Sequence, residues 1–267
     1  GVDSVLAVQA VNRIRSELDV PSLAPTVLFE RPTPRALADW ILERRGTVPA
    51  AAAAPAPSAA RPGDVAIGGR AGRCPGAAAP NALWELGAAG RDAVGEVPPE
   101  RWDWRSRFDP TPGRPGRSYS RWGGFLAGLD RFDSLFFQVP PADARLMDPQ
   151  QRLFLETAWH CLETAGYAGD ALRGTRTGVW FASSHTAYRD REGMRPHLLD
   201  LAAMQANGLS IVPNRFSFLM DFRGPSVFVD TLCSSSLVAL HQASEAIRRG
   251  DCPAALVGAA NAIVNPD

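Results

Sequence analysis

Residues 227–241, with the sequence VFVDTLCSSSLVALH, determine how the rest of the chain is interpreted. The first three residues are β-branched or aromatic, which is typical of a buried strand, and Asp230 and Thr231 then indicate a sharp turn. The apolar residues that follow recur at helical spacing: Leu237, Leu240 and Ile247. Gly250 comes after two arginines and is a good C-terminal stop for this helix. The pattern therefore predicts a strand, a turn and a helix.

Cys233 lies at the predicted junction between this strand and this helix. The first backbone N–H groups of a helix have no intrahelical acceptor, and together with the helix dipole they favour a thiolate over a thiol. The three serines that follow fit a helix start. Free cysteine is also among the most buried residue types, so core packing is the alternative interpretation.

Residues 230–241, DTLCSSSLVALH, resemble the active-site signature of β-ketoacyl synthases, specifically the ketosynthase domains of modular polyketide synthases. The resemblance implies that Cys233 accepts an acyl chain as a thioester and then transfers it to a carbanion formed by decarboxylation. It also implies a thiolase-type layered α/β fold, which this chain would contain in truncated form, and a homodimer with active sites near its interface.

The bulk composition excludes several other classes of function. The chain has 267 residues, with 28 basic and 28 acidic side chains, and every basic residue is arginine. A neutral balance gives no reason to expect nucleic acid or an anionic membrane as a partner. The four cysteines are widely spaced, so we expect neither a metal site nor a disulfide framework. No apolar run approaches the roughly 20 residues of a membrane span, which favours a cytoplasmic protein.

Residues 1–46 have the pattern of helices. The apolar residues after Ser4 lie on one face of a helix: Val8, Val11, Ile14 and Leu18. Ser4 at the start of this helix is either an N-cap or a functional hydroxyl. A second helix is predicted after Thr33, which would cap it, with Pro34 in the first helical position.

The sequence GVDSV at residues 1–5 resembles the phosphopantetheine attachment motif of acyl carrier proteins, and residues 25–34 resemble the loop before their last helix. By that resemblance Ser4 carries 4′-phosphopantetheine, and residues 1–46 are part of a helical-bundle carrier domain. An exposed serine at a helix start suits a bulky phosphodiester, because the helix N-terminus favours its charge.

The composition divides the chain into three regions. Residues 1–46 are the partial carrier domain, and residues 47–63, rich in alanine and proline, are predicted to be a semi-extended linker. By the resemblance described above, residues 64–267 are the N-terminal part of a ketosynthase domain. Further elements of this region are predicted as strands at 64–68, 177–182 and 254–261, and as a helix that starts at Asp148 and Pro149 and runs to Gly166.

The four histidines do not occur in sequences that resemble the family's two catalytic histidine motifs. His241 lies about two helical turns from Cys233, which indicates packing or a supporting role. His160 and Cys161 are neighbours on a helix, where their side chains diverge. His185 and His197 lie in a polar, aperiodic segment and are not expected to be catalytic. Cys74 occupies a position where phenylalanine is usual, and we interpret it as a packing substitution.

The resemblance therefore implies a segment of a longer megasynthase that condenses acyl thioesters with malonyl-type extenders held on carrier proteins. We expect this chain alone to do no more than acquire an acyl group at Cys233. Two alternatives remain: a thiolase-like acyltransferase that uses the same cysteine, and an inactive carrier and docking segment.

Overall fold

A computed structural model describes residues 4–18, 20, 23, 27–31, 33–45, 63–184, 188–190 and 201–266. The chain divides into two compact units, Gly1–Asp64 and Val65–Asp267. Among the described helices, none combines the length and the apolar character needed to cross a bilayer. The predicted linker at 47–63 lies outside the described residues except for Gly63.

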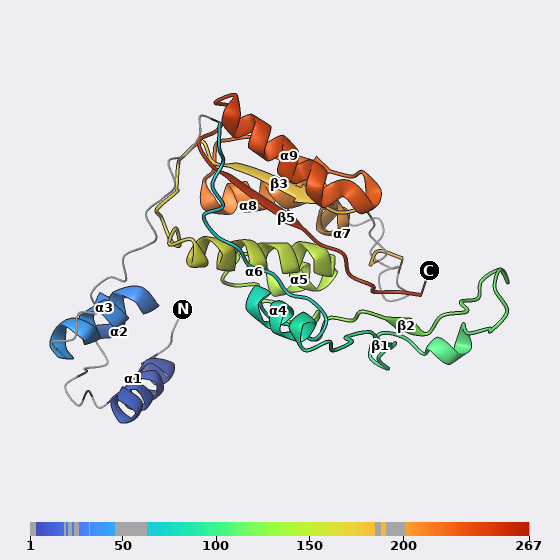
Figure 1. The fold of residues 1–267 in the computed structure, drawn as a ribbon, viewed down its shortest axis with the longest axis horizontal. Coiled ribbons are helices and arrows are strands. Elements are labelled where there is room, and N and C mark those ends of the chain that lie inside the picture. The colour runs from blue at the N-terminus through green and yellow to red at the C-terminus, as the bar shows by residue number, and fades with distance from the viewer. Residues whose placement is uncertain are drawn as a thin grey trace. The chain divides into compact units, whose positions relative to one another are not determined.

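The described residues of the first unit form three helices, α1 (Ser4–Leu18), α2 (Val27–Glu30) and α3 (Pro34–Arg45) (Figure 1). Its core is a cluster of apolar side chains: Val11, Val20, Leu23, Val27, Leu37 and Ile41. The hydroxyl of Thr33 accepts a hydrogen bond from the Ala36 N–H at 3.2 Å, which confirms the predicted cap. The two predicted helices are present, and α2 is an additional short helix within the segment interpreted as a loop.

The second unit is a mixed α/β structure. Its helices are α4 (Pro80–Ala88), α5 (Pro141–Leu146), α6 (Pro149–Thr164), α7 (Leu201–Asn207), α8 (Ile211–Met220) and α9 (Ser235–Arg248), with 3-10 turns η1 (Trp104–Ser106) and η3 (Leu232–Ser234). Its strands are β1 (Gly95–Glu96), β2 (Trp122–Gly123), β3 (Gly178–Ala182), β4 (Ser226–Val229) and β5 (Ala255–Ala259). The short strands β1 and β2 form an antiparallel pair apart from the main sheet.

The main sheet is parallel, in the order β4-β3-β5. Ala182 at the end of β3 is aligned with Val229 of β4 and Ala259 of β5, so the carboxyl ends of all three strands meet at one edge. The central strand β3 is buried along its whole length. Parallel strands covered on both faces have continuous apolar sequences of this kind, and the predicted strands at 177–182, 227–229 and 254–261 are confirmed.

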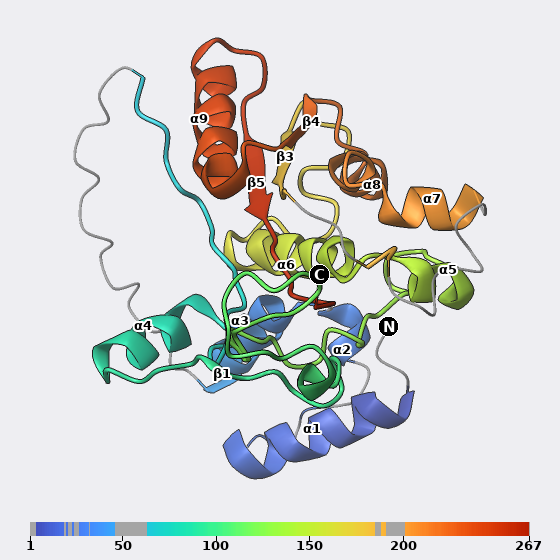
Figure 2. The same cartoon turned by 90° about the vertical axis from the view of Figure 1, so that its right-hand side faces the viewer.

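Helices cover both faces of this sheet (Figures 1 and 2). Val179 and Phe181 of β3 pack in one apolar cluster with residues of α6 and α8, whereas Trp180 and Ala182 pack in another with α9. This alternation follows from the two-residue period of a strand. On α9 the buried side chains that meet the sheet are small: Ala239, Ala243 and Ala246. Leu237 and Leu240 are exposed.

Helix α6 begins as the sequence predicts. The side chain of Asp148 accepts a hydrogen bond from the Gln150 N–H at 2.8 Å, and Pro149 occupies the first helical position. Leu155 and Leu162 are buried in the core. The whole first turn of this helix is buried, which places polar side chains inside the domain and close to the end of β3.

The predicted strand at residues 64–68 is wrong. Residues 64–70 have no regular secondary structure, and Ile67 is 83% exposed. A short apolar run becomes a strand only where a neighbouring backbone pairs with it. Within the described part of the chain, the sheet contains β4, β3 and β5, and none of them pairs with this segment.

Candidate functional site

The candidate site lies at the edge of the main sheet where the parallel strands end. Ser183 follows β3, and its N–H donates to the carbonyl of Val229 at the end of β4 at 3.3 Å. Asp230 and Thr231 follow β4 and lead directly into η3. In open parallel sheets, ligands bind outside the carboxyl ends of the strands, so this edge is the expected position for a reactive group.

Cys233 is the middle residue of η3, between the end of β4 and the start of α9. The predicted position at the strand-to-helix junction is therefore confirmed. Its thiol is free and exposed, in contrast to the core packing that a cysteine in an apolar segment would usually show. An exposed sulfur held on a tight turn can approach a substrate carbonyl without rearrangement of the backbone.

The turn before Cys233 has an uncommon backbone conformation. Leu232 has a φ of +56°, in the left-handed region that a residue with a branched side chain rarely adopts. Such conformations cost on the order of 1–3 kcal/mol and persist only when surrounding contacts impose them. A sharp strained turn between a strand and a helix also presents the nucleophile in α/β-hydrolases. No signal in the sequence indicates this conformation, because leucine does not favour positive φ.

Hydrogen bonds within the turn hold it in this conformation. The buried Ser235 hydroxyl donates to the Leu232 carbonyl at 2.7 Å and accepts from the Thr231 N–H at 2.8 Å. The Asp230 carboxylate accepts from the Leu232 N–H at 3.1 Å. The Ser234 hydroxyl donates to the Thr231 carbonyl at 2.9 Å. The polar residues around Cys233 therefore fix the backbone that carries it.

A buried polar group from α6 supports the neighbouring strand end. The Ser183 hydroxyl donates to the side-chain oxygen of Gln150 at 3.0 Å. The adjacent Gln151 donates to the Ala206 carbonyl at 2.7 Å, at the end of α7. These contacts connect the N-terminus of α6 to the site edge and to α7. The sequence identified this helix start but not the polar contacts that its buried side chains make.

The other three cysteines are less accessible. Burial raises the pKa of the Cys161 thiol, although the Ala71 N–H opposes this shift by donating to the sulfur. Burial also raises the pKa of Cys252, which is only 1% exposed. Cys74 and Cys161 both line a cavity of about 330 Å³ beside α6 and β5. Cys74 is half-buried, and the packing interpretation of this residue stays a prediction.

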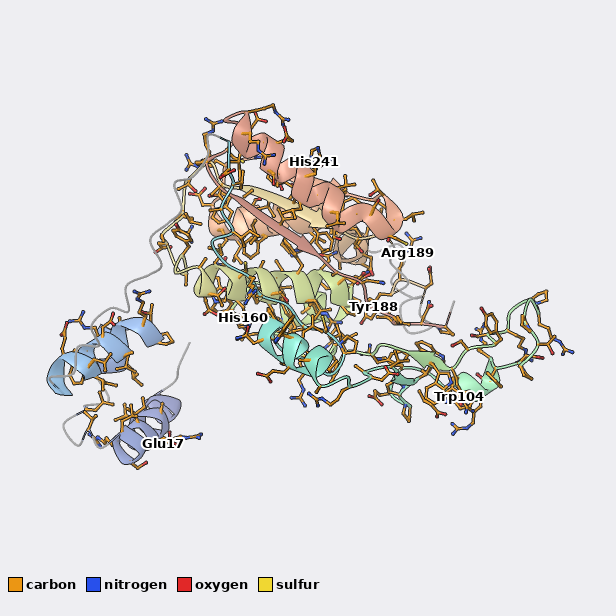
Figure 3. The ribbon with its side chains drawn as sticks, in the orientation of Figure 1. Glu17, Trp104, His160, Tyr188, Arg189 and His241 are labelled. Carbon is orange, nitrogen blue, oxygen red and sulfur yellow. The ribbon has the colours of Figure 1, made fainter. Side chains whose placement is uncertain are left out.

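The two described histidines lie on different helices. His241 lies on α9 and His160 on α6, on opposite sides of the sheet (Figure 3). Cys233 lies in η3, before α9 begins at Ser235, whereas His241 lies nearly two turns inside α9. The Nδ1 atom of His160 lies 2.9 Å from the Glu163 carboxylate on the protein surface. Both residues are exposed, and the expectation that they are not catalytic stays a prediction; His185 and His197 lie outside the described residues.

Ser4 is the first residue of α1, as the helix pattern predicts. A helix of 15 residues starting there supplies free N–H groups that favour a phosphate. The described first turn of α1 contains no acidic residue that would repel such a group. The side chain of Ser4 lies outside the described residues.

Two families match different parts of the chain. Residues 63–267 match the family described as "Beta-ketoacyl synthase, N-terminal domain". Residues 1–41 match the family described as "Phosphopantetheine attachment site". The two matches lie in the order in which the two sequence motifs occur.

Curated relatives align along the whole chain. The spectinabilin polyketide synthase system protein NorC of Streptomyces orinoci is 44% identical, and the alignment covers 100% of this chain and 12% of that protein. Erythronolide synthase EryA3 of Saccharopolyspora erythraea is 42% identical, and the alignment covers 100% of this chain and 9% of that protein. The chain therefore spans about a tenth of the length of these relatives.

Solved structures resemble the second unit. The oxazolomycin ketosynthase domain OzmH KS7 of Streptomyces albus JA3453 has a TM-score of 0.70 and 42% identity, covering 75% of this chain and 34% of that chain. The ketosynthase from module 6 of the bacillaene synthase of Bacillus subtilis 168 has a TM-score of 0.64 and 32% identity. The match covers 74% of this chain and 32% of that chain. These likenesses agree with the thiolase-type layered α/β fold that the sequence predicts.

Proposed function

This chain belongs to the β-ketoacyl synthase family, and from that membership we propose that Cys233 is the acyl-accepting nucleophile of a polyketide ketosynthase. One observation above all supports the proposal: the free thiol of Cys233 is exposed on a strained turn between β4 and α9. This position lies at the carboxyl edge of a parallel sheet, where substrates of such folds bind.

The proposed reaction of this chain is acyl transfer. The thiolate of Cys233 attacks the carbonyl carbon of an acyl thioester, and the carbonyl oxygen becomes an oxyanion. The backbone N–H of Cys233 contributes to stabilising that oxyanion. The bond between the carbonyl carbon and the donor sulfur then breaks, and the acyl group remains as a thioester on Cys233. The donor sulfur leaves as a thiolate and takes a proton from solvent, to which the Cys233 thiol had released its own.

The match of residues 1–41 indicates a covalently attached 4′-phosphopantetheine, and we propose Ser4 as its attachment site. When attached, this group supplies a long flexible arm with a terminal thiol that carries acyl chains as thioesters. Ser4 would hold the arm through a phosphodiester at the N-terminus of α1. The free N–H groups of that helix start stabilise the negative charge of the phosphodiester.

For the longer protein, we propose decarboxylative Claisen condensation of the Cys233-bound acyl chain with a malonyl-type extender on a carrier protein. The partners of this chain are then acyl-carrying and malonyl-carrying domains and the remaining domains of the megasynthase. None of the four histidines lies in a sequence that resembles the family's catalytic histidine motifs. The proposed activity of the chain by itself is therefore the acylation of Cys233.

We propose a homodimer as the working assembly. The outer edge of β4 has no strand partner among the described residues. Two residues of this strand, Val227 and Phe228, are half-buried. A free strand edge can pair with the same edge of a second copy. The proposal places the protein in the cytoplasm, because its four cysteines are all free thiols and such thiols persist in a reducing compartment.

Acylation can be tested by incubating the chain with a small acyl thioester and measuring the intact mass. We expect the mass to increase by one acyl group, and the increase to disappear in Cys233→Ala. Cys74→Ala is the matched control and should acylate like the unaltered chain. Equal acylation of Cys233→Ala would contradict the proposal.

The two alternative interpretations predict different outcomes. A phosphopantetheinyl transferase with coenzyme A should modify the chain at Ser4, with Ser4→Ala as the test and the exposed Ser16→Ala as the control. Modification of Ser4 together with an inert Cys233 would favour the carrier and docking interpretation. A thiolase-like acyltransferase would accept acyl groups from coenzyme A thioesters as readily as from carriers, which an assay with both donors separates.

A further inference from the structure

Arg152 on α6 is a buried cation whose side chain is incompletely satisfied. The residue is 7% exposed, and its Nε atom has no hydrogen-bond partner among the described residues. Burial lowers the pKa of this arginine, and the nearby side chains of Tyr188, Asp148, Asp130 and Glu156 oppose that shift. A buried charged donor without an acceptor is costly, so an arginine in this state indicates a site for an anionic partner.

Arg152 forms part of the wall of a cavity of about 430 Å³. The guanidinium carbon lies 5.8 Å from the centroid of the Tyr188 ring, and Tyr188 is labelled in Figure 3. The hydroxyl of Tyr188 donates to the Arg145 carbonyl at 2.9 Å, which holds the ring at the cavity. The charged residues lining the cavity are Glu100, Arg101, Asp130, Arg145 and Arg152.

Among the residues that line this cavity, three arginines outnumber two carboxylates. Arg101 donates a hydrogen bond to the Leu126 carbonyl, so part of its guanidinium is already used. The lining carboxylates of Glu100 and Asp130 are exposed to solvent, which screens them, whereas Arg152 is enclosed. Asp148 is also buried, but its carboxylate accepts the Gln150 N–H at the start of α6. Within the described part of the chain, no carboxylate forms an ion pair with Arg152.

We propose that this cavity is a binding site for a small oxyanion, a carboxylate or a phosphate, held by Arg152. The planar guanidinium presents parallel N–H donors that match two oxygens of either group. Arg145 adds a second positive charge at the cavity wall. The site is separate from the proposed acylation of Cys233 and does not depend on it.

Calorimetric titration of the 267-residue chain with malonate and, separately, with inorganic phosphate tests the site at constant ionic strength. Saturable binding of either anion is expected, and the anion that binds identifies the source as carboxylate or phosphate. Loss of a charged hydrogen-bond donor should weaken binding by about tenfold or more in Arg152→Met. Arg173→Met is the matched control, because Arg173 is an exposed arginine paired with Asp170 outside the cavity.

A second variant keeps the test decisive if Arg152→Met does not fold. Arg145 is exposed, so Arg145→Glu should leave the fold intact while placing a negative charge at the cavity, and anion binding should weaken severalfold. The proposal is overturned if neither anion binds the unaltered chain saturably. It is also overturned if Arg173→Met weakens binding as much as the cavity variants, since binding would then reflect surface charge alone.

Discussion

The conformation of single residues determines the chemistry that is possible at the end of β4. The exposed Cys233 directly follows Leu232, which adopts a positive φ, and the Ser235 hydroxyl bonds to the Thr231 N–H and the Leu232 carbonyl of that turn. The sequence was sufficient to predict the junction, because β-branched residues, a polar turn and a helical pattern occur in succession. It was not sufficient to predict the strained leucine, whose conformation results from contacts across the turn.

Alkylation rates should separate Cys233 from the buried thiols. The thiolate is the reactive form, and burial raises the pKa of Cys161 and Cys252, which lowers their thiolate fraction at any pH below that pKa. We expect iodoacetamide at about pH 8 to modify the exposed Cys233 faster than either residue. Peptide mass spectrometry over time would measure this. Faster labelling of Cys161 would show that the Cys233 thiol is less accessible than the structure indicates.

Glu156 on α6 should make stability depend on pH. Burial raises its pKa above the ordinary value of 4.5, against the opposing effects of the Asp133 N–H and Arg73. The folded chain therefore binds this proton more tightly than the unfolded chain, and the linkage lowers stability as pH rises through the carboxyl's titration range. Glu156→Gln removes that loss. At about pH 7 we therefore expect the variant to have a higher free energy of unfolding than the unaltered chain.

The difference between Glu156→Gln and the unaltered chain should shrink as pH falls below the carboxyl's ordinary pKa of 4.5, where both forms are neutral. Urea unfolding at about pH 7 and about pH 4 measures this difference. The exposed Glu85 on α4 provides the control Glu85→Gln, for which no such convergence is expected. A variant that is less stable than the unaltered chain at neutral pH would mean that the Arg73 contact outweighs the cost of burial.

At the scale of elements, periodicity predicted which segments are helices or strands but not what each one packs against. The spacing of Leu237 and Leu240 correctly indicated a helix, yet α9 meets the sheet through Ala239 and Ala243. Small residues allow the close approach of a helix to a sheet, and alanine is a weak signal in a hydropathy pattern. For the segment containing Ile67 the predicted element itself was wrong. The apolar run suggested a strand, but no neighbouring strand among the described residues pairs with it.

The small residues of α9 should tolerate enlargement poorly. Ala243 is 1% exposed and packs in the cluster with Trp180 and Val229, so Ala243→Leu should destabilise the second unit by about 1–3 kcal/mol through overpacking. Leu237 on the same helix is 71% exposed, and Leu237→Gln should change stability by no more than about 0.5 kcal/mol. Thermal unfolding followed by circular dichroism compares the two. A larger loss of stability for Leu237→Gln than for Ala243→Leu would show that the leucines, and not the alanines, form the buried face of α9.

At the scale of the whole molecule, the two compact units have separate apolar cores. The cluster of the first unit draws its members from residues 11–41, and the clusters of the second unit draw theirs from residues beyond 120. The change in composition near residue 47 indicated this division, and the two family matches fall on either side of it. Separate cores mean that stability in one unit does not require contacts in the other.

A substitution that creates a cavity in the core of the first unit should therefore leave the second unit unaffected. Leu23 is fully buried among the helices of the first unit, and Leu23→Ala should destabilise that unit by about 2–5 kcal/mol through lost contacts and the cavity left behind. Hydrogen exchange measured by mass spectrometry should show faster exchange in α1 and α3 and unchanged exchange in β3 and α9. The acylation of Cys233 should also be unchanged. Faster exchange throughout the sheet would instead show that the two units unfold as one cooperative structure.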